Sequence, residues 1–319
     1  MNNLLVTIVV PIYNESGNII PLINELDKHC KGFQYEVLFV NDGSTDHTES
    51  ILNQLSFATD HVHHLHLVRN YGHQMALKAG IDAARGDAVI CMDGDLQHPP
   101  YLVPILVNEW QKGYNIVVTH RIDSDHTPLY KKVSSRWFYK FMNWLSDTKL
   151  KYGEADFRLI DRKVADIFKQ ISEPDLFLRG FTRWVGFKVS EVKYKAEERF
   201  TGTSKYSFRK MMTLAINGIL SFSTKPLYLS IYAGLISSLI SILVLIYAMI
   251  SYFSGHVVAG WTSTLIIIAF FCGIQLTILG IAGLYIGRIF IQTKNRPLYI
   301  IGSNSYRIHE KETIGTTQF

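Results

Sequence analysis

Short apolar runs alternate with segments of helical periodicity over the first part of the chain. The apolar runs are rich in β-branched residues and predict strands over residues 4–12, 35–40, 64–68, 88–92, 115–119 and 187–194. Apolar residues three or four positions apart predict helices over residues 17–30, 48–55, 73–84 and 102–112. Strand and helix alternate four times before residue 93. This alternation predicts an α/β fold with a mostly parallel sheet and helices on both of its faces.

Two later segments contain no charged residue, Pro226 to Phe253 and Trp261 to Gly287. Each is longer than the roughly 20 residues that cross the hydrocarbon core of a bilayer. A buried helix of a soluble domain would usually be shorter and would have a polar face. We therefore expect two membrane-spanning helices.

The basic residues around these two segments predict their orientation. The connecting residues 254–260 contain no Lys or Arg, whereas the outer flanks carry Arg209, Lys210, Lys225, Arg288, Lys294 and Arg296. Lys and Arg are retained on the cytoplasmic side of a membrane. We expect a multi-pass protein of the cytoplasmic membrane, with both termini and the N-terminal domain in the cytoplasm.

These patterns divide the chain into four parts. Residues 1–205 form the predicted cytoplasmic α/β domain, and residues 206–225 an amphipathic region that lies at the membrane surface. Residues 226–291 contain the two membrane helices, and residues 292–319 form a cytoplasmic tail. The tail is polar after Tyr299, so we expect it to be partly disordered.

Composition narrows the classes of function. The three cysteines, Cys30, Cys91 and Cys272, have no metal-ligand spacing, which argues against a disulfide framework or a zinc site. The net charge of +5 is modest, and no basic patch is interleaved with aromatic residues, so we expect no nucleic-acid partner. The imidazoles at His61, His63, His64 and His66 predict a solvated sheet edge rather than a metal site.

The fourth predicted strand ends in an acidic motif that contains Asp93, Asp95 and Gln97. Alternate residues of an extended segment point the same way, so these three side chains are expected to converge. Oxygen ligands without thiolates suit a hard divalent cation, Mg²⁺ or Mn²⁺, that retains water and a substrate phosphate. In open α/β sheets, ligands bind at the carboxyl ends of the strands. The motif therefore predicts a metal site at that edge.

Two other strand ends carry polar groups. The first strand ends in VPIYNE, residues 10–15, and the second in NDGS, residues 41–44. Asp42 is well placed for the edge of a base or a ribose, and Gly43 allows a close backbone approach. Either segment alone is more often only a turn. Together with the acidic motif they give three adjacent strand ends with polar groups.

The order of these motifs resembles the family-two glycosyltransferases of GT-A fold. The segments are VVPIYNE, NDGSTD, RNYGHQMALKAGIDAARGD and MDGDLQHPP. The closer resemblance is to the polyprenyl-phosphate branch, which includes dolichol-phosphate mannose synthase and the bactoprenol glucosyltransferases. Residues 155–159 (ADFRL), residues 199–206 (RFTGTSKY) and the two apolar segments match that branch too. The resemblance covers nearly the whole chain, to about Arg296.

The resemblance implies roles for particular residues. The nucleotide would be bound by Pro11, Tyr13, Glu15, Asp42 and Asp93. The metal would be held by Asp93, Asp95 and Gln97. The residues expected to act in catalysis are Asp95 and Asp156, the latter near the acceptor. The phosphates would be contacted by Arg121, Lys132, Ser135, Arg199 and Lys205. Lys132 stands where arginine is common in the family, and lysine lacks the bidentate fork that arginine offers to phosphate.

The resemblance also implies the reaction. A membrane-bound inverting glycosyltransferase would move one sugar from a nucleotide sugar, UDP-glucose or UDP-N-acetylglucosamine first, to undecaprenyl phosphate. A metal and basic side chains would stabilise the leaving nucleoside diphosphate. The acceptor phosphate is largely dianionic at neutral pH, so no strong general base is required. A flippase and a downstream membrane glycosyltransferase would then use the product for the cell envelope, and the glycine-rich spans permit a homo-oligomer.

Three other functions are the alternatives to this one. A processive polysaccharide synthase would need more spans for a polymer channel, and Gly180 stands where its QxxRW element has glutamine. A non-catalytic sensor of nucleotide sugars would not need the acidic motif beside Asp156, Arg199 and Lys205. A transporter is disfavoured because the spans contain no charged residue before Arg288.

Overall fold

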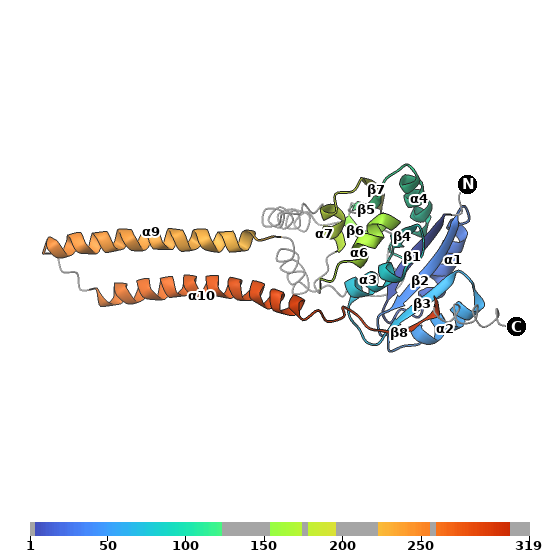
Figure 1. Ribbon diagram of the computed structural model, residues 1–319, viewed down its shortest axis with the longest axis horizontal. Helices are drawn as coiled ribbons and strands as arrows, with labels where there is room; N and C mark the ends of the chain where they lie inside the picture. The colour runs from blue at the N-terminus through green and yellow to red at the C-terminus, as the bar shows by residue number, and fades with distance from the viewer. Residues whose placement is uncertain (1–3, 123–153, 174–177, 196–222, 256–259, 307–319) are drawn as a thin grey trace.

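The computed structural model describes residues 4–122, 154–173, 178–195, 223–255 and 260–306. One mixed sheet of eight strands, in the order β7-β5-β6-β4-β1-β2-β3-β8, forms the centre of the N-terminal domain (Figure 1). Its strands are β1 (Leu5–Ile12), β2 (Gln34–Asn41), β3 (Val62–Leu67), β4 (Ala88–Cys91), β5 (Ile116–Ile122), β6 (Glu154–Asp161), β7 (Val189–Lys195) and β8 (Ile301–Asn304). The helices are α1 (Ile19–His29), α2 (Thr48–Ala58), α3 (His73–Ala83), η1 (Pro100–Leu102), α4 (Val103–Gln111), α6 (Arg162–Lys169), α7 (Leu178–Trp184), α9 (Lys225–Phe253) and α10 (Trp261–Thr293).

The buried side chains form a core on each face of the sheet. Alternate residues of β1 point to opposite faces, so Ile8 packs in one core and Val9 in the other. Helices α1 and α4 cover the first face, with Leu22 and Leu106 fully buried. Helices α3 and α6 cover the second. The two cores therefore confirm the predicted layers, with helices on both faces of the sheet.

The predicted strands and helices of the first 122 residues are all present, and β4, β1, β2 and β3 are parallel neighbours. Strand β6 was not predicted. It lies between β5 and β4 and is antiparallel to both. Its sequence, EADFRLID, has no long apolar run because it contains Asp156 and Arg158. These two charged side chains form an ion pair inside the protein. The sheet is thus mostly parallel with antiparallel β6 and β8.

The segment after Tyr299 returns to the sheet, so the expectation of disorder is wrong for residues 300–306. Strand β8 pairs antiparallel with β3 and covers what would otherwise be the edge of the sheet. Ser305 accepts a hydrogen bond from the backbone N–H of His64 at 2.9 Å, and Tyr306 is buried. An unpaired strand edge leaves backbone groups without partners, and β8 supplies them. The rest of the predicted tail, residues 307–319, lies outside the described residues.

The same pairing corrects the prediction for the histidines. Because β8 covers β3, His64 and His66 do not lie at a solvated edge and are only 2% and 5% exposed. Their rings stack with centroids 4.4 Å apart. The ring of His66 lies within hydrogen-bond distance of Asn41 at 3.1 Å and of Asn53 at 3.2 Å. These imidazoles are packing residues beneath the returning segment.

Burial of these two imidazoles predicts an acid-dependent loss of stability. Burial lowers the pKa of His64 and of His66 to about 4, and for His64 the neighbouring His66 adds to the effect. In the unfolded chain an imidazole has a pKa near about 6.5, so between pH 6.5 and 4 the unfolded state binds more protons. The free energy of unfolding should therefore fall by up to about 1.4 kcal/mol per pH unit for each ring. Denaturation of wild type and His64→Phe at pH 7.5 and 5 tests this: the variant should lose less stability on acidification, and equal losses would contradict the account.

Helices α9 and α10 project away from the sheet domain (Figure 1). The segments Lys225–Ser251 and Phe270–Thr293 are long and apolar enough to cross a membrane, and no part of their apolar windows is buried within the protein. The Tyr285 hydroxyl donates to the carbonyl of Ser223 at 2.8 Å, which joins α10 to the residues just before α9. Such an extensive exposed apolar surface is typical of contact with lipid rather than water. The amphipathic helix predicted before α9 lies almost wholly in residues 196–222, outside the described residues.

Candidate active site

Polar segments meet at the carboxyl edge of the central strands. Strand β1 pairs in parallel with β4 on one side and with β2 on the other. The acidic motif follows β4, residues 13–15 follow β1, and Asp42 follows β2. Antiparallel β6 lies on the other side of β4, where Arg158 pairs with Cys91 and Asp156 extends toward the same edge. The strand order therefore brings four predicted segments to one place.

The acidic motif is a turn rather than an extended segment. Strand β4 ends at Cys91, and Leu96 has a positive φ of 62°. The backbone N–H of Gln97 donates to Asp95 Oδ1 at 3.1 Å. Alternation along an extended strand, the basis on which we expected convergence of the three side chains, is therefore wrong. The role of Asp93, Asp95 and Gln97 as metal ligands stays a prediction.

Gly94 explains how this turn lies so close to β1. A Cβ atom at position 94 would be only 2.7 Å from the Ile12 side chain, so a larger residue would displace the end of β1. The close approach places the acidic motif beside the polar residues after β1. Its tight packing also makes the turn a rigid support for the two carboxylates.

Asp93 has an unused oxygen in this turn. Its Oδ1 is buried and has no hydrogen-bond partner among the described residues, and His73 Nε2 lies 3.4 Å from it. No group of three or more His, Cys, Asp or Glu side chains within the described ranges is arranged to hold a metal ion. Mg²⁺ is usually held by one or two carboxylates together with waters and substrate phosphates. Asp93 and Asp95 fit that kind of open site.

His98 holds the backbone of the acidic motif. Its Nδ1 accepts a hydrogen bond from the Asp93 N–H at 3.0 Å, which leaves the proton on Nε2, 3.6 Å from Asp93 Oδ2. The ring stacks on Phe157, with centroids 5.1 Å apart. Because Phe157 belongs to β6, His98 connects the turn after β4 to the strand that carries Asp156.

Asp156 is held by a bidentate arginine. Arg179 of α7 donates from Nε to Oδ1 at 2.9 Å and from a terminal nitrogen to Oδ2 at 2.8 Å. Burial alone would raise the pKa of Asp156, but the charge and hydrogen bonds of Arg179 outweigh it and hold this pKa well below its usual range. His73 Nε2 lies 3.9 Å from Asp156 Oδ2 and so bridges Asp93 and Asp156. A carboxylate of such low basicity is a weak general base.

Arg158 is a second charged partner of Asp156 and is only 2% exposed. It donates to Asp156 Oδ1 at 3.2 Å and to the Thr182 hydroxyl at 3.0 Å. It also donates to the backbone carbonyls of Ala155 and Leu178. These bonds tie β6 to α7, so the Asp156–Arg179 pair rests on a fully engaged buried guanidinium.

Arg121 lies at the end of β5, on the same side of the site. The pKa of the buried Tyr194 hydroxyl depends on the charges near it. Burial raises this pKa to about 12, Asp93 also raises it, and Arg121 and Arg179 lower it. The charges of Arg121, Arg179 and Asp93 therefore all act on one buried phenol. The predicted phosphate contact Arg121 is exposed and free of the core, as such a contact requires.

Asp42 is buried, and both of its carboxylate oxygens accept hydrogen bonds from the protein. It accepts hydrogen bonds from the backbone N–H groups of Tyr71 at 2.7 Å and Gly72 at 2.9 Å. Burial raises the pKa of its carboxyl, and these two bonds only partly offset the effect. Gly43 has a φ of +66°, and a Cβ there would be 2.4 Å from the backbone of Arg69. Asp42 and Gly43 thus pack the segment before α3 against the end of β2.

The residues after β1 vary in exposure. Pro11 is buried in β1, Tyr13 is 40% exposed, and Glu15 accepts a hydrogen bond from Asn18 at 2.5 Å. The Asn14 N–H donates to the Ser44 hydroxyl at 2.9 Å, which joins the segments after β1 and β2. Tyr13 therefore offers an aromatic face beside Asp42, while Pro11 and Glu15 shape the turn. Their nucleotide contacts stay predictions.

Four predicted phosphate contacts, Lys132, Ser135, Arg199 and Lys205, lie outside the described residues. Conversely, the structure adds side chains that sequence reasoning did not assign to the site, namely His73, His98, Arg158 and Tyr194. A signal for two of them was present, because His73 and His98 belong to the motifs YGHQ and QHPP. Arg179, which sequence reasoning did not assign to the site, is the bidentate partner of Asp156.

Comparison with known proteins agrees with this architecture. A model of glycosyl transferase family 2 matches residues 7–168, more than half of the chain. The chain belongs to glycosyl transferase family 2. It is therefore a glycosyltransferase with a GT-A-like α/β domain, as the resemblance implied.

Relatives of this family-2 glycosyltransferase align along nearly their whole length. The SfII prophage-derived bactoprenol glucosyl transferase of Shigella flexneri is 41% identical over 93% of this chain and 97% of that protein. The uncharacterized glycosyltransferase YkcC of Bacillus subtilis is 40% identical over 96% of this chain and 95% of that protein. Among solved structures, a mannosyltransferase from Pyrobaculum calidifontis in complex with GDP-mannose and Mn²⁺ matches with a TM-score of 0.47 and 15% identity, over 68% of this chain and 63% of that one.

Proposed function

We propose that this glycosyltransferase transfers a single glucose from UDP-glucose to a polyprenyl phosphate at the cytoplasmic face of the bacterial inner membrane. One observation carries the proposal: relatives about 40% identical along almost the full chain are named bactoprenol glucosyl transferases. The two long apolar helices agree with a lipid acceptor, because they would keep the domain at the membrane. UDP-N-acetylglucosamine is the alternative donor.

The donor would lie along the carboxyl ends of β4, β1 and β2. Tyr13 offers a surface for the base beside the Asp42 turn, and Asp93 and Asp95 would face the diphosphate. These two carboxylates would hold Mg²⁺ or Mn²⁺, which when bound supplies positive charge to the leaving diphosphate. The unused Oδ1 of Asp93 supports this assignment, since a buried carboxylate oxygen without a donor is costly unless it receives one.

The acceptor phosphate would approach from the side of β5 and β6. Arg121, exposed at the end of β5, would attract it, with Lys132, Ser135, Arg199 and Lys205 as further proposed contacts. A phosphate monoester is largely dianionic at neutral pH and attacks without a strong base. Asp156 would therefore act by holding Arg179 and His73 in position. Attack from the face opposite the leaving group inverts the configuration at the sugar carbon.

The remaining proposed partners follow from the product. A lipid-linked sugar made in the cytoplasm must cross the bilayer before it decorates an external polymer, so a flippase and a downstream membrane glycosyltransferase are proposed. The absence of Lys and Arg from residues 254–260, against the basic outer flanks, supports a cytoplasmic catalytic domain. The glycines of α10, with open space at Gly280, Gly283 and Gly287, would permit close packing against a second copy in the membrane.

The donor is tested with a panel. The purified full chain in lipid discs with undecaprenyl phosphate and Mn²⁺ would be given UDP-glucose, UDP-N-acetylglucosamine, UDP-galactose or GDP-mannose. Mass spectrometry of the extracted lipid should find one added hexose with UDP-glucose and much less product with the others. Preference for GDP-mannose would overturn the UDP assignment, and a ladder of added sugars would favour a processive synthase.

A further inference from the structure

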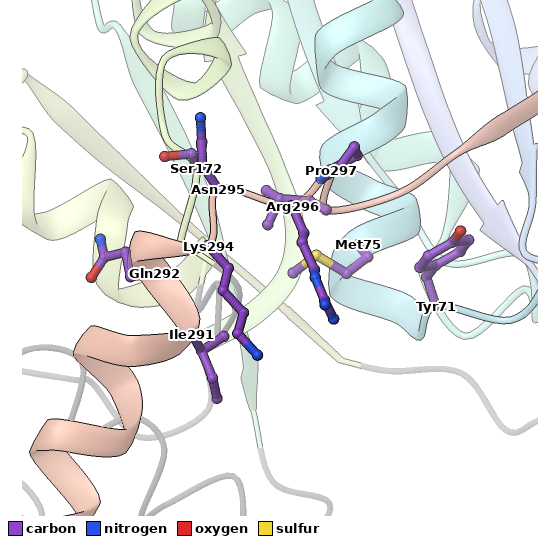
Figure 2. Close-up of a pocket in the computed structure, with 10 residues that line it drawn as sticks. Tyr71, Met75, Ser172, Ile291, Gln292, Lys294, Asn295, Arg296 and Pro297 are labelled. Atoms are coloured by element: carbon purple, nitrogen blue, oxygen red, sulfur yellow. The ribbon is translucent and has the colours of Figure 1, made fainter.

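A cavity of about 310 Å³ lies where α10 ends and the chain returns to the sheet domain. Helix α10 ends at Thr293, and Asn295 turns the backbone with a positive φ of 45°. The walls come from this turn, from the start of α3 and from Ser172, in the segment that follows α6 (Figure 2). The cavity therefore lies between the end of the membrane helix and the catalytic domain.

The lining of the cavity is basic and partly apolar. It contains two cations, Lys294 and Arg296, and none of the ten lining residues is acidic. Figure 2 shows both cationic side chains extending to the same side of the returning segment, with Met75 beside them. Ile291 and Leu298 add apolar surface. Two cations beside hydrocarbon match the junction between a phosphate headgroup and an alkyl chain.

The dipole of helix α10 accounts for only one of the two cations. A cation at the C-terminal end of a helix interacts favourably with the helix dipole. Lys294 is the C-cap residue of α10, and its Nζ lies 4.1 Å from the centre of the Phe290 ring. Arg296 lies beyond the turn at Asn295, where the dipole effect has fallen off. The Arg296 side chain is exposed and can therefore reach an anionic group outside the helix.

The position of the cavity at the end of a predicted membrane span also indicates a lipid ligand. The segment Phe270–Thr293 is long and apolar enough to cross a bilayer and ends directly at the cavity. If that segment spans the membrane, Lys294 and Arg296 lie at the level of the lipid headgroups. The cavity is also close to the active site. Its wall residue Tyr71 donates a backbone hydrogen bond to Asp42, and His73, two residues later, approaches Asp93.

We propose that this cavity binds the phosphate of a membrane lipid, with Lys294 and Arg296 as its cationic contacts. The inference rests on the membrane association proposed above, but it does not require that any particular sugar is transferred. Two lipids share this chemistry: a polyprenyl phosphate, held beside the active site before transfer, and an anionic phospholipid, which would anchor the domain at the bilayer surface.

The test measures binding directly, without turnover. The detergent-solubilised full chain would be titrated in native mass spectrometry with farnesyl phosphate, dihexanoyl phosphatidylglycerol, dihexanoyl phosphatidylcholine and inorganic phosphate. The double variant Lys294→Gln/Arg296→Gln should weaken binding of the anionic lipids by about 10-fold or more, because two charge-assisted contacts are lost. The control Lys163→Gln/Lys188→Gln removes two exposed charges at the opposite, amino-terminal edge of the sheet and should bind as the wild type does.

A second variant makes the test independent of the two basic residues. Ser172→Asp adds a negative charge to another wall of the cavity and should also weaken binding of the anionic lipids. Stronger loss for farnesyl phosphate identifies the polyprenyl source, and stronger loss for phosphatidylglycerol the phospholipid source. The proposal would be overturned if the wild type and both cavity variants bound the anionic lipids with equal affinity. It would also be overturned if the wild type bound phosphatidylcholine or inorganic phosphate as tightly as the anionic lipids. Because UDP binding is measured on the same samples, failure of the donor site is recognised separately.

Discussion

Replacing Asp95 with alanine is expected to reduce turnover by about 10³-fold, the scale on which loss of transition-state charge stabilisation acts. Asp95 lies in the turn after β4, where its Oδ1 accepts a hydrogen bond from the Gln97 N–H. The role proposed for Asp95 is to bind the metal ion that stabilises the donor diphosphate. Release of UDP and formation of lipid-linked sugar would be measured together at saturating Mn²⁺.

The thermal midpoint of Asp95→Ala should stay within a few degrees of the wild type, because this carboxylate is only half-buried. Asp60→Ala provides the matched control, since Asp60 is an exposed aspartate before β3, at the opposite edge of the sheet. It should turn over as the wild type does. If Asp95→Ala retains a third or more of wild-type turnover, the acidic motif is not the metal site.

Replacing Asp156 with asparagine is expected to destabilise the protein by about 3 kcal/mol, because an unpaired buried charge costs several kcal/mol. The amide keeps the shape of the carboxyl group but cannot neutralise Arg158, which is 2% exposed and whose other buried carboxylate, Glu154, is more distant at 3.9 Å. Arg179 is partly exposed and can regain water, which keeps the loss at the lower end of that range. Turnover should fall as well, since Arg179 and His73 lose the carboxylate that orients them.

Three comparisons separate this effect from a general loss of folding. Asp166→Asn removes a half-exposed ion-paired carboxylate on α6 and should cost less than about 1 kcal/mol. The double variant Asp156→Asn/Arg179→Gln should be more stable than the sum of the two single changes predicts, because the residues are in direct contact. Since the pKa of Asp156 is lowered in the folded protein, its contribution is present above about pH 4 and is lost as the pH falls further. An Asp156→Asn variant of wild-type stability and turnover would refute its role.

The parts of the fold that the sequence predicted are those with local signals. Continuous β-branched runs identify β1, β2 and β4, because strands buried on both faces need no polar residues. Once these strands are parallel neighbours, their carboxyl ends must lie together, so Asp93, Tyr13 and Asp42 could be placed at one edge. The two long apolar helices were equally clear from composition.

The parts that were missed depend on pairing between distant residues. Asp156 and Arg158 look too polar for a central strand, and only the partners supplied by α7 make their burial possible. Similarly, β8 joins β3 from more than 200 residues away, so the histidines of β3 looked solvated. The turn after β4 was taken as extended because the positive φ at Leu96 has no sequence signature comparable to a glycine.

The central claim is that the edge formed by β6, β4, β1 and β2 transfers glucose to a lipid phosphate. The most direct measurement follows UDP and lipid product in one reaction, with the full chain in discs that contain undecaprenyl phosphate, UDP-glucose and Mn²⁺. The account predicts one UDP released for each lipid that gains a single hexose, with both signals lost together in Asp95→Ala. UDP release without a glucosylated lipid, or the same lipid product in wild type and Asp95→Ala, would contradict it.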